Sequence, residues 1–376
     1  MSQLKDEFAA AGAKFTLEIL EKLKAADSKE NVIISPFSLQ TCMALAFTGA
    51  QGETAQEIAS TMKYASNCTQ EVAQNFRCIL DQYQDSDLLK MANKIYVKEG
   101  KKIKDAYENT TKESYHAEAE IINFSESEAA AQTINNWVEN KTSGKITELI
   151  PSQVLGDDTR LVLLNALHFK GSWQCKFDEA NTHEGDFWTD AEQSVKVQYM
   201  RQTAYFNQGY FHKHKFSLLE LPYKDSDLSM MILLPDERNG LKEVMEQLKD
   251  INLLELTEKI SSDEIILVLP KFKVDFAVDA KNVLQEMGIE KAFTEEADFS
   301  GMLEPSEDIN ISNIFHKASI EVNEEGTEAA AASGAIMMAR CLMSFEFIAD
   351  HPFLYWIWNK KNILFAGTFV NAPKEA

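Results

Sequence analysis

Long hydrophobic runs are absent from this sequence of 376 residues, because polar or charged residues interrupt every apolar stretch before it reaches 18 residues. A transmembrane helix needs about 20 predominantly apolar residues, so we expect no membrane span. Basic residues are also in short supply: 37 lysines and arginines stand against 59 aspartates and glutamates, for a net charge of −22. Nucleic acids and anionic membranes attract basic surfaces. The sequence therefore predicts neither of them as a partner.

Cysteine and histidine are too sparse for a disulfide framework or a metal centre. The chain has five cysteines, an odd number, and none stands in a Cys-x-x-Cys pair. Its seven histidines show no metal-ligand spacing, and the short motifs of common hydrolases, metalloenzymes and nucleotide-binding proteins are missing. We therefore expect no metal, no required cofactor, no enzymatic activity and at least one unpaired thiol.

Proline and glycine are few as well, with 8 and 15 residues, and they are spread along the chain instead of gathering in a linker. A chain of this length often forms two or three domains, but the absence of a linker predicts a single domain over residues 1–376. Apolar periodicity predicts helices within 8–24, 68–83, 126–149 and 277–287, and a strand from 32 that enters a helix ending near 47. It also predicts strands at 89–97, 161–173, 218–221, 228–234, 264–276 and 315–322. The chain closes with a predicted hairpin of 350–354 and 364–369.

Two helix starts carry capping residues. Ser35 or Ser38 is placed to cap the helix that has Pro36 near its start, and Thr54 is placed to cap the helix that follows Gly52. The run from 161 to 173 is too continuously apolar for a half-solvated strand. We therefore expect it at the centre of a sheet that is buried on both faces.

The most unusual stretch runs from Glu321 to Ser344, because its first half has almost no large side chains. Four consecutive alanines at 329–332 favour a short helix or a linker. The alternative is a strand held in reserve, since every second residue from Thr327 to Ala335 is no larger than threonine. Such a strand could enter a packed sheet without steric conflict.

Residues 324–333, Glu-Glu-Gly-Thr-Glu-Ala-Ala-Ala-Ala-Ser, resemble the hinge of an inhibitory serpin. In that family the scissile bond follows the seventeenth residue counted from the first glutamate, which is Arg340 here. The resemblance thus implies cleavage at Arg340–Cys341 within a reactive-centre loop of about 324–347. The implied hinge comprises Glu324, Glu325, Gly326, Thr327, Glu328, Ala329, Ala330, Ala331, Ala332 and Ser333.

The resemblance extends over the whole chain, including the segments 48–54, 161–173 and 297–302. It implies an α+β fold, the serpin fold, with about nine helices around three β-sheets and an exposed loop that can insert into the main sheet. It also implies a shutter, a hydrogen-bonded cluster beneath the central strands, formed by Ser35, Ser38, Asn165 and His316.

The function implied by this resemblance is suicide inhibition of a protease. A serine protease would form an acyl-enzyme with Arg340, and insertion of the loop would trap the complex before hydrolysis. The Arg340 guanidinium suits trypsin-like serine proteases, which bind it with a carboxylate. Two alternatives stay open, namely cross-class inhibition of a cysteine protease and a non-inhibitory carrier or chaperone-like serpin.

Location and accessory partners are less constrained. The segment 349–358 resembles arthropod serpins, which predicts a secreted monomer acting in innate immunity. The N-terminal residues lack a signal-peptide pattern, and the Arg-Cys bond also occurs in intracellular serpins, so the cytoplasm is the alternative. One loop gathers basic residues that could bind a heparin-like glycosaminoglycan, or could form a solvated turn: Lys98, Lys101, Lys102 and Lys104.

Overall fold

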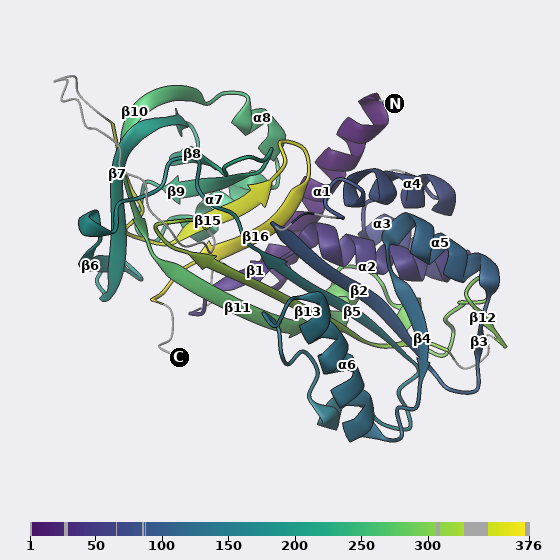
Figure 1. Ribbon diagram of the computed structural model, residues 1–376. Coiled ribbons are helices and arrows are strands. Elements are labelled where there is room, and N and C mark those ends of the chain that lie inside the picture. The colour runs from purple at the N-terminus through teal and green to yellow at the C-terminus, as the bar shows by residue number, and fades with distance from the viewer. Residues whose placement is uncertain are drawn as a thin grey trace. The chain divides into compact units, whose positions relative to one another are not determined.

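The computed structural model describes residues 2–25, 29–64, 66–84, 86, 88–305, 309–326 and 345–372 (Figure 1). This part of the chain forms nine α-helices together with a five-stranded, a nine-stranded and a two-stranded sheet, which confirms the predicted α+β class. The chain divides into two compact units, one of Met1–Lys22, Ile34–His168 and Phe276–Ser319, the other of Leu23–Ile33, Phe169–Asp275 and Ile320–Ala376. The single domain stays a prediction.

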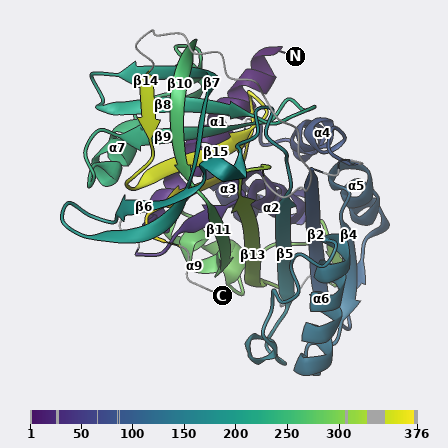
Figure 2. The same cartoon turned by 60° about the vertical axis from the view of Figure 1, so that its left-hand side comes forward.

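Most of the five-stranded sheet belongs to the first unit. Its strand order is β11 (Phe272–Asp279), β13 (Ile311–Val322), β5 (Leu161–Phe169), β2 (Leu89–Lys98) and β4 (Glu118–Ile122), and Figure 2 shows these strands side by side. A small sheet pairs β12 (Leu303–Glu304) with β3 (Lys102–Ile103). The α-helices of this unit are α1 (Ser2–Lys22), α2 (Pro36–Gly49), α3 (Gly52–Thr61), α4 (Thr69–Leu80), α5 (Asp105–Tyr115), α6 (Ser127–Lys141) and α9 (Lys281–Glu286).

The second unit is built around the nine-stranded sheet. Its strand order is β1 (Val32–Ile34), β16 (Ile363–Phe369), β15 (Phe353–Trp358), β9 (Ser229–Pro235), β8 (Phe216–Pro222), β7 (Ser194–Phe211), β10 (Ser261–Pro270) and β14 (Phe345–Ile348), with β6 (His183–Trp188) on β7. Two short helices, α7 (Leu241–Leu248) and α8 (Leu253–Thr257), belong to this unit.

The centre of the five-stranded sheet is a direct parallel pair of β13 and β5, in which His316 lies opposite Asn165. All nine residues of β5 are buried, as the continuous apolar run predicts. Apolar side chains of α6 pack on one face of the sheet, where Ile134 and Val138 belong to the same core cluster as Val162. On the other face, α2 approaches β5 closely enough for a contact between the Cys42 thiol and the Leu164 carbonyl. The sheet is therefore buried on both faces at its centre.

The start of α2 follows the predicted capping pattern, whereas that of α3 does not. Ser35 is the cap of α2, because its Oγ accepts a hydrogen bond of 3.1 Å from the Ser38 backbone N–H. Thr54 was predicted to cap α3, and this is wrong: the N-cap is Gln51, three residues before Thr54, and it is followed by Gly52 at φ +54°. The Thr54 hydroxyl instead accepts a hydrogen bond of 3.0 Å from the Asp298 N–H.

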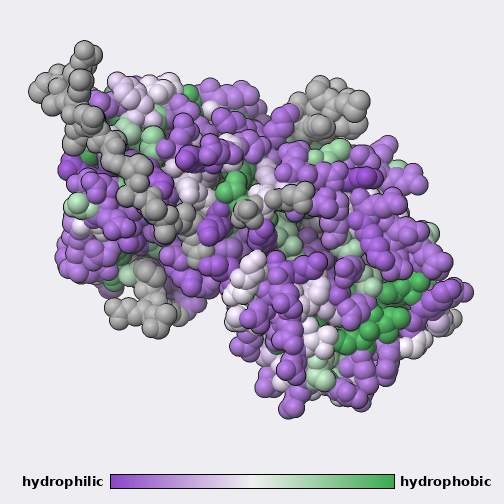
Figure 3. All heavy atoms as spheres, viewed as in Figure 1, coloured by the Kyte–Doolittle hydropathy of each residue, from purple (hydrophilic) through white to green (hydrophobic). Residues whose placement is uncertain are grey.

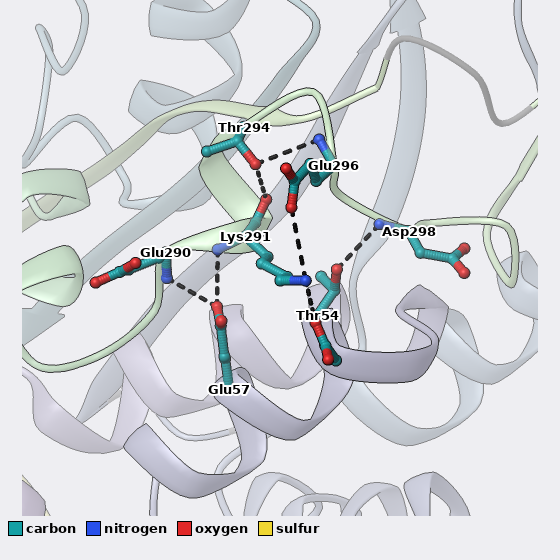
Figure 4. A network of polar contacts seen from close by, with 8 residues as sticks. Thr54, Glu57, Glu290, Lys291, Thr294, Glu296 and Asp298 are labelled. Atoms are coloured by element: carbon teal, nitrogen blue, oxygen red, sulfur yellow. Dashed lines mark hydrogen bonds and ion pairs between the residues drawn. The ribbon is translucent and has the colours of Figure 1, made fainter.

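A polar network on α3 holds the loop that leads towards β13 (Figure 4). The Glu57 carboxylate accepts backbone N–H groups of Glu290 at 2.8 Å and Lys291 at 2.7 Å. The Lys291 ammonium forms ion pairs with Glu53 and Glu296, and its hydrogen bond and charge hold the pKa of Glu53 below the ordinary value. These contacts fix the loop at several points.

Hydrophilic residues cover most of the face seen in Figure 3, in keeping with the net charge of −22.

Candidate functional site

The first part of the candidate site is a tight turn directly after β13. Asn323 and Gly326 exchange two backbone hydrogen bonds, of 2.9 and 3.2 Å, which reverse the chain. Gly326 has φ +137°, and a Cβ built on it would lie 2.2 Å from the Gly171 carbonyl oxygen. Only glycine combines this backbone angle with so close an approach. The predicted hinge residue Gly326 is thus a fixed pivot for the chain that follows it.

The turn is anchored to residues 171–177, just beyond the end of β5. The Trp173 indole N–H donates to the Asn323 carbonyl at 2.9 Å, and its backbone N–H donates to the Glu325 carbonyl at 3.0 Å. The Trp173 ring stacks on Tyr223, with 4.7 Å between centroids. A buried aromatic pair therefore holds the turn in place.

The first two residues of the predicted hinge, Glu324 and Glu325, form ion pairs within the second unit. Glu324 is 5% exposed, and its carboxylate accepts hydrogen bonds from the Lys271 ammonium at 2.8 Å and the Thr182 hydroxyl at 2.6 Å. Burial acts to raise the pKa of Glu324, but hydrogen bonds from Lys271 and Thr182 outweigh it, so its pKa lies below the ordinary value. Glu325 pairs with Lys176. The carboxylates thus fasten the start of the hinge.

We predict that Glu324→Gln lowers the free energy of unfolding by about 2 kcal/mol, because the buried side chain at this position would lose its charge-assisted hydrogen bond from Lys271. Glu321→Gln is the matched control, since the Glu321 carboxylate has only a 3.5 Å contact with Asn323 and is less buried. Urea unfolding of the three proteins measures the difference. Equal midpoints for both variants would contradict a fastening role of Glu324.

The second part of the site is a buried polar cluster beneath the β13–β5 pair, in the first unit. The four residues predicted as a shutter lie together here and are fully buried. His316 on β13 bonds to Asn165 on β5, and the Asn165 amide donates to the Ser38 carbonyl at 3.0 Å and to its hydroxyl. Side chains of this cluster therefore join the two central strands to the start of α2.

The tautomer of His316 follows from its contacts. Its Nε2 accepts the Ser35 backbone N–H at 3.1 Å, so the proton is on Nδ1 and is donated to the Asn165 oxygen. Burial lowers the pKa of His316 to about 3, because desolvation disfavours the charged imidazolium. The imidazole is neutral at physiological pH.

This pKa predicts a pH dependence of stability. Between pH 6.5 and about 3, an unfolded His316 binds a proton that the folded protein excludes, so stability falls as pH falls in this window. The variant His316→Gln is the reference, because its amide can replace both hydrogen bonds. For each unit by which the pH falls, the free energy of unfolding of the wild type should decrease by about 1.4 kcal/mol more than that of the variant. Urea unfolding between pH 7 and 4 tests this, and parallel profiles of the two proteins would refute it.

Sequence reasoning missed several members of both parts. The Asn93 side chain on β2 accepts from Asn165 and contacts the Ser38 hydroxyl at 3.4 Å, so it belongs to the buried cluster. The sequence did contain a signal for Asn93, because an asparagine side chain within the predicted apolar strand 89–97 needs a hydrogen-bond partner. The sequence gave no signal for the residues that bind the hinge glutamates, namely Lys271, Thr182 and Lys176, because lysine and threonine are common on protein surfaces.

Other predicted residues stand apart from the site or lie outside the described residues. The Lys98 ammonium donates to the Asp157 carbonyl. The Lys104 ammonium donates to the Ser300 carbonyl at 2.7 Å. These two ammonium groups therefore point to different loops. The hinge from Thr327 to Ser333 and the predicted bond Arg340–Cys341 lie outside the described residues. No group of metal-binding side chains occurs in the part of the chain that is described.

Comparison with known proteins places this geometry in a family. The family model described as serpin (serine protease inhibitor) matches residues 10–372. The chain belongs to the serpin family. This serpin is 36% identical over 357 residues to serine protease inhibitor 42Dd of Drosophila melanogaster, covering 94% of this chain and 95% of the relative. It is 37% identical over 378 residues to the human leukocyte elastase inhibitor, covering 97% and 99%.

A solved structure supports the same assignment. Serpin48 of the insect Tenebrio molitor has a TM-score of 0.89 and 35% sequence identity, over 97% of this chain and 98% of that chain. The predicted serpin resemblance is therefore confirmed. Among the described residues of this serpin, no helix is long and apolar enough to cross a membrane.

Proposed function

We propose that this serpin is a suicide inhibitor of trypsin-like serine proteases that is cleaved at Arg340–Cys341. The observation that carries the proposal is the direct pairing of β13 with β5, together with the reversal of the chain at Gly326. A strand that continues from this turn would run antiparallel to β13, along the seam between the two central strands. The small residues after Gly326 suit that position.

The chemistry begins at the Arg340 carbonyl carbon. The protease serine forms an ester bond to it, the amide bond to Cys341 breaks, and the catalytic histidine gives its proton to the departing amine of Cys341. The result is an acyl-enzyme with Arg340 as the acyl group. Hydrolysis by water would release a cleaved substrate, so trapping requires that insertion is faster than this step.

Insertion exchanges one strand pairing for two. The β13–β5 ladder opens, and each of these strands then pairs with the loop, which satisfies an additional row of backbone groups. β13 has 12 residues, so a loop strand of matching length would extend from 327 to about 338. We infer that the buried cluster acts as a latch, because the His316–Asn165 hydrogen bond bridges the seam and must break before a strand can enter.

The target class follows from Arg340. A guanidinium at the scissile bond fits a protease pocket that ends in a carboxylate, and this supports a trypsin-like target. A relative named for elastase shows that members of the family differ in their targets. Cross-class inhibition of a cysteine protease shares the acyl-enzyme chemistry and is the alternative.

The test is to mix the protein with trypsin and to separate the products on a denaturing gel with mass spectrometry. We expect a stable adduct of the summed mass and a released peptide that begins at Cys341. Trypsin with a blocked catalytic serine is the control and should give neither product. Cleavage after Arg340 without an adduct would favour the non-inhibitory carrier, and the absence of cleavage there would refute the assigned bond.

For the location, we favour the cytoplasm over the predicted extracellular space. Similarity to vertebrate B-type serpins supports the cytoplasmic alternative. Among the described residues, Cys42, Cys68, Cys78 and Cys175 are all free, and Cys68 and Cys175 are exposed, which suits a reducing compartment. The monomeric state, the role in innate immunity and the glycosaminoglycan contact of the lysine loop stay predictions.

A further inference from the structure

The seam between β13 and β5 ends in a cavity of about 440 Å³ that lies within the first unit. Its walls include Asp157 and Asp158, just before β5, and Asn310 and Ser312, around the start of β13. A hydrogen bond of 2.9 Å from the Arg160 backbone N–H to the Ser312 hydroxyl joins the two sides. We call this hollow the seam-end cavity. Its size is typical of a ligand site, and its position makes it the last place that an inserting strand would reach.

The register of the hinge turn determines which loop residue arrives there. Asn323 and Gly326 face each other in the turn, because they exchange two backbone hydrogen bonds. Each later residue of an inserted strand would therefore fall opposite the next earlier residue of β13. Counted in this way, Ser333 falls opposite His316. The inserted strand thus crosses the buried cluster at Ser333.

Arg340 reaches the far end of the seam in the same register. His316 is paired with Asn165 on β5, so Ser333 would lie between these two residues. Arg340 follows Ser333 by seven residues. Asp158 precedes Asn165 by the same number. An inserted strand that runs antiparallel to β5 therefore brings Arg340 beside Asp158, at the seam-end cavity.

The side chain of Arg340 would point to the face of the sheet on which this cavity lies. Residues that are opposite each other in a sheet share a face, so Ser333 points towards α2, as His316 does. Side chains alternate along a strand, and Arg340 is an odd number of residues away, so it points to the face of α6. The cavity wall lies on this face too, because Leu155 belongs to one core cluster with Ile134 of α6.

The seam-end cavity presents carboxylates to an arriving guanidinium. Within the described residues, the exposed Asp158 carboxylate has no ion-pair or hydrogen-bond partner. The Asp157 carboxylate beside it accepts a hydrogen bond from the Ser125 hydroxyl. A guanidinium forms paired, charge-assisted hydrogen bonds with a carboxylate. The Asp158 carboxylate is therefore free to accept such a pair.

Two cations lie close to these carboxylates, and both have other partners. The Lys281 ammonium lines the cavity and donates to the Ser312 carbonyl at 3.2 Å. The Arg160 guanidinium donates to the backbone carbonyl of Asp157 at 2.7 Å. Neither cation is paired with Asp158, so an arriving arginine meets no competitor for that carboxylate.

We propose that the seam-end cavity is a receiving site for Arg340, whose guanidinium binds the carboxylates of Asp158 and Asp157 once the loop is inserted. The inference rests on the proposed function, since it needs Arg340 as the acyl group and the loop as a strand. Hydrolysis of the acyl-enzyme requires the guanidinium in the protease pocket, where it positions the ester for attack by water. Transfer of the guanidinium to Asp158 removes this positioning and leaves the ester bond intact. The cavity thus prolongs the life of the adduct.

The test measures the lifetime of purified trypsin adducts by the return of trypsin activity on a chromogenic substrate. Asp158→Asn removes the charge and keeps the size of the side chain. Trypsin should return about tenfold faster from this adduct than from that of wild type. The rate constant and the stoichiometry of inhibition should stay unchanged, because both are decided before Arg340 reaches the cavity. Thermal denaturation verifies that the variant is folded.

Glu148→Gln is the matched control for the loss of one negative charge. Glu148 is exposed in the same connection between α6 and β5, and it stands outside the lining of the cavity. Its adduct should have the lifetime of the wild-type adduct. Equal lifetimes for wild type and Asp158→Asn, with adducts still forming, would overturn this inference and leave the proposed function standing.

A second background shows whether Asp158 acts on Arg340 or on the protease. Arg340→Ala is combined with Asp158→Asn, and adducts are formed with a serine protease that accepts alanine. In this background Asp158→Asn should leave the lifetime unchanged. A shorter lifetime here as well would mean that Asp158 contacts the protease itself, which would overturn the inference. The absence of any adduct between wild type and trypsin would overturn the proposed function, and this inference with it.

Discussion

Thr327→Arg should convert this serpin from an inhibitor into a substrate of trypsin. If the loop enters the seam between β13 and β5, Thr327 is the first residue after the Gly326 pivot to point into the packed interior. Burying an unpaired guanidinium there costs several kcal/mol, so insertion slows and water reaches the acyl-enzyme first. The stoichiometry of inhibition, the number of inhibitor molecules consumed per protease trapped, should rise about tenfold.

The neighbouring alanines separate this explanation from a simple effect of charge. Ala331→Glu places a carboxylate on the same inward face as Thr327, whereas Ala330→Glu places it on the opposite face, which already carries the charge of Glu328. We expect the first variant to behave as a substrate and the second to remain an inhibitor. Equal stoichiometry for Ala330→Glu and Ala331→Glu would contradict an inserted strand in this register.

Arg340→Ala should reduce the rate of inhibition of trypsin about a thousandfold. The guanidinium is the group that the carboxylate of a trypsin-like pocket recognises, and alanine leaves that buried carboxylate unpaired. The rate constant of inhibition, measured with excess serpin, gives the effect directly. The hinge is unchanged in this variant, so its stoichiometry with proteases that accept alanine should stay low.

Cys341→Ser is the control for the other side of the scissile bond. Serine has nearly the same size as cysteine, and the leaving group of acylation is the backbone amine in both. We expect a rate constant close to that of wild type. Unchanged inhibition by Arg340→Ala, or a large loss in Cys341→Ser, would place the scissile bond elsewhere.

The central strand and the buried cluster were both predictable from unusual residue patterns. The continuous apolar run from Leu161 is unusual for anything but a strand buried on both faces. Polar side chains such as Asn165 and His316 in apolar strands need partners, and the serpin resemblance connected residues 151 positions apart. From the residues alone, their pairing could not be predicted.

Other features were beyond sequence reasoning for physical reasons. β7 spans 18 residues from Ser194 to Phe211, and its many polar outward residues blur the apolar periodicity that marks a strand. The ion pair of Lys271 with Glu324 joins residues far apart in the chain, and either residue alone is typical of a solvated surface. Such pairs become visible only when the fold brings them together.

Amide hydrogen exchange of the protease adduct tests the central claim most directly. We predict that residues 327–338 exchange about a hundredfold more slowly in the adduct than in the uncleaved serpin. β13 and β5 should stay protected, because they change partners without losing their ladder bonds. Deuterium uptake of peptides from these three segments gives the answer. An adduct in which residues 327–338 gain no protection would mean that the protease is held without insertion of the loop between β13 and β5.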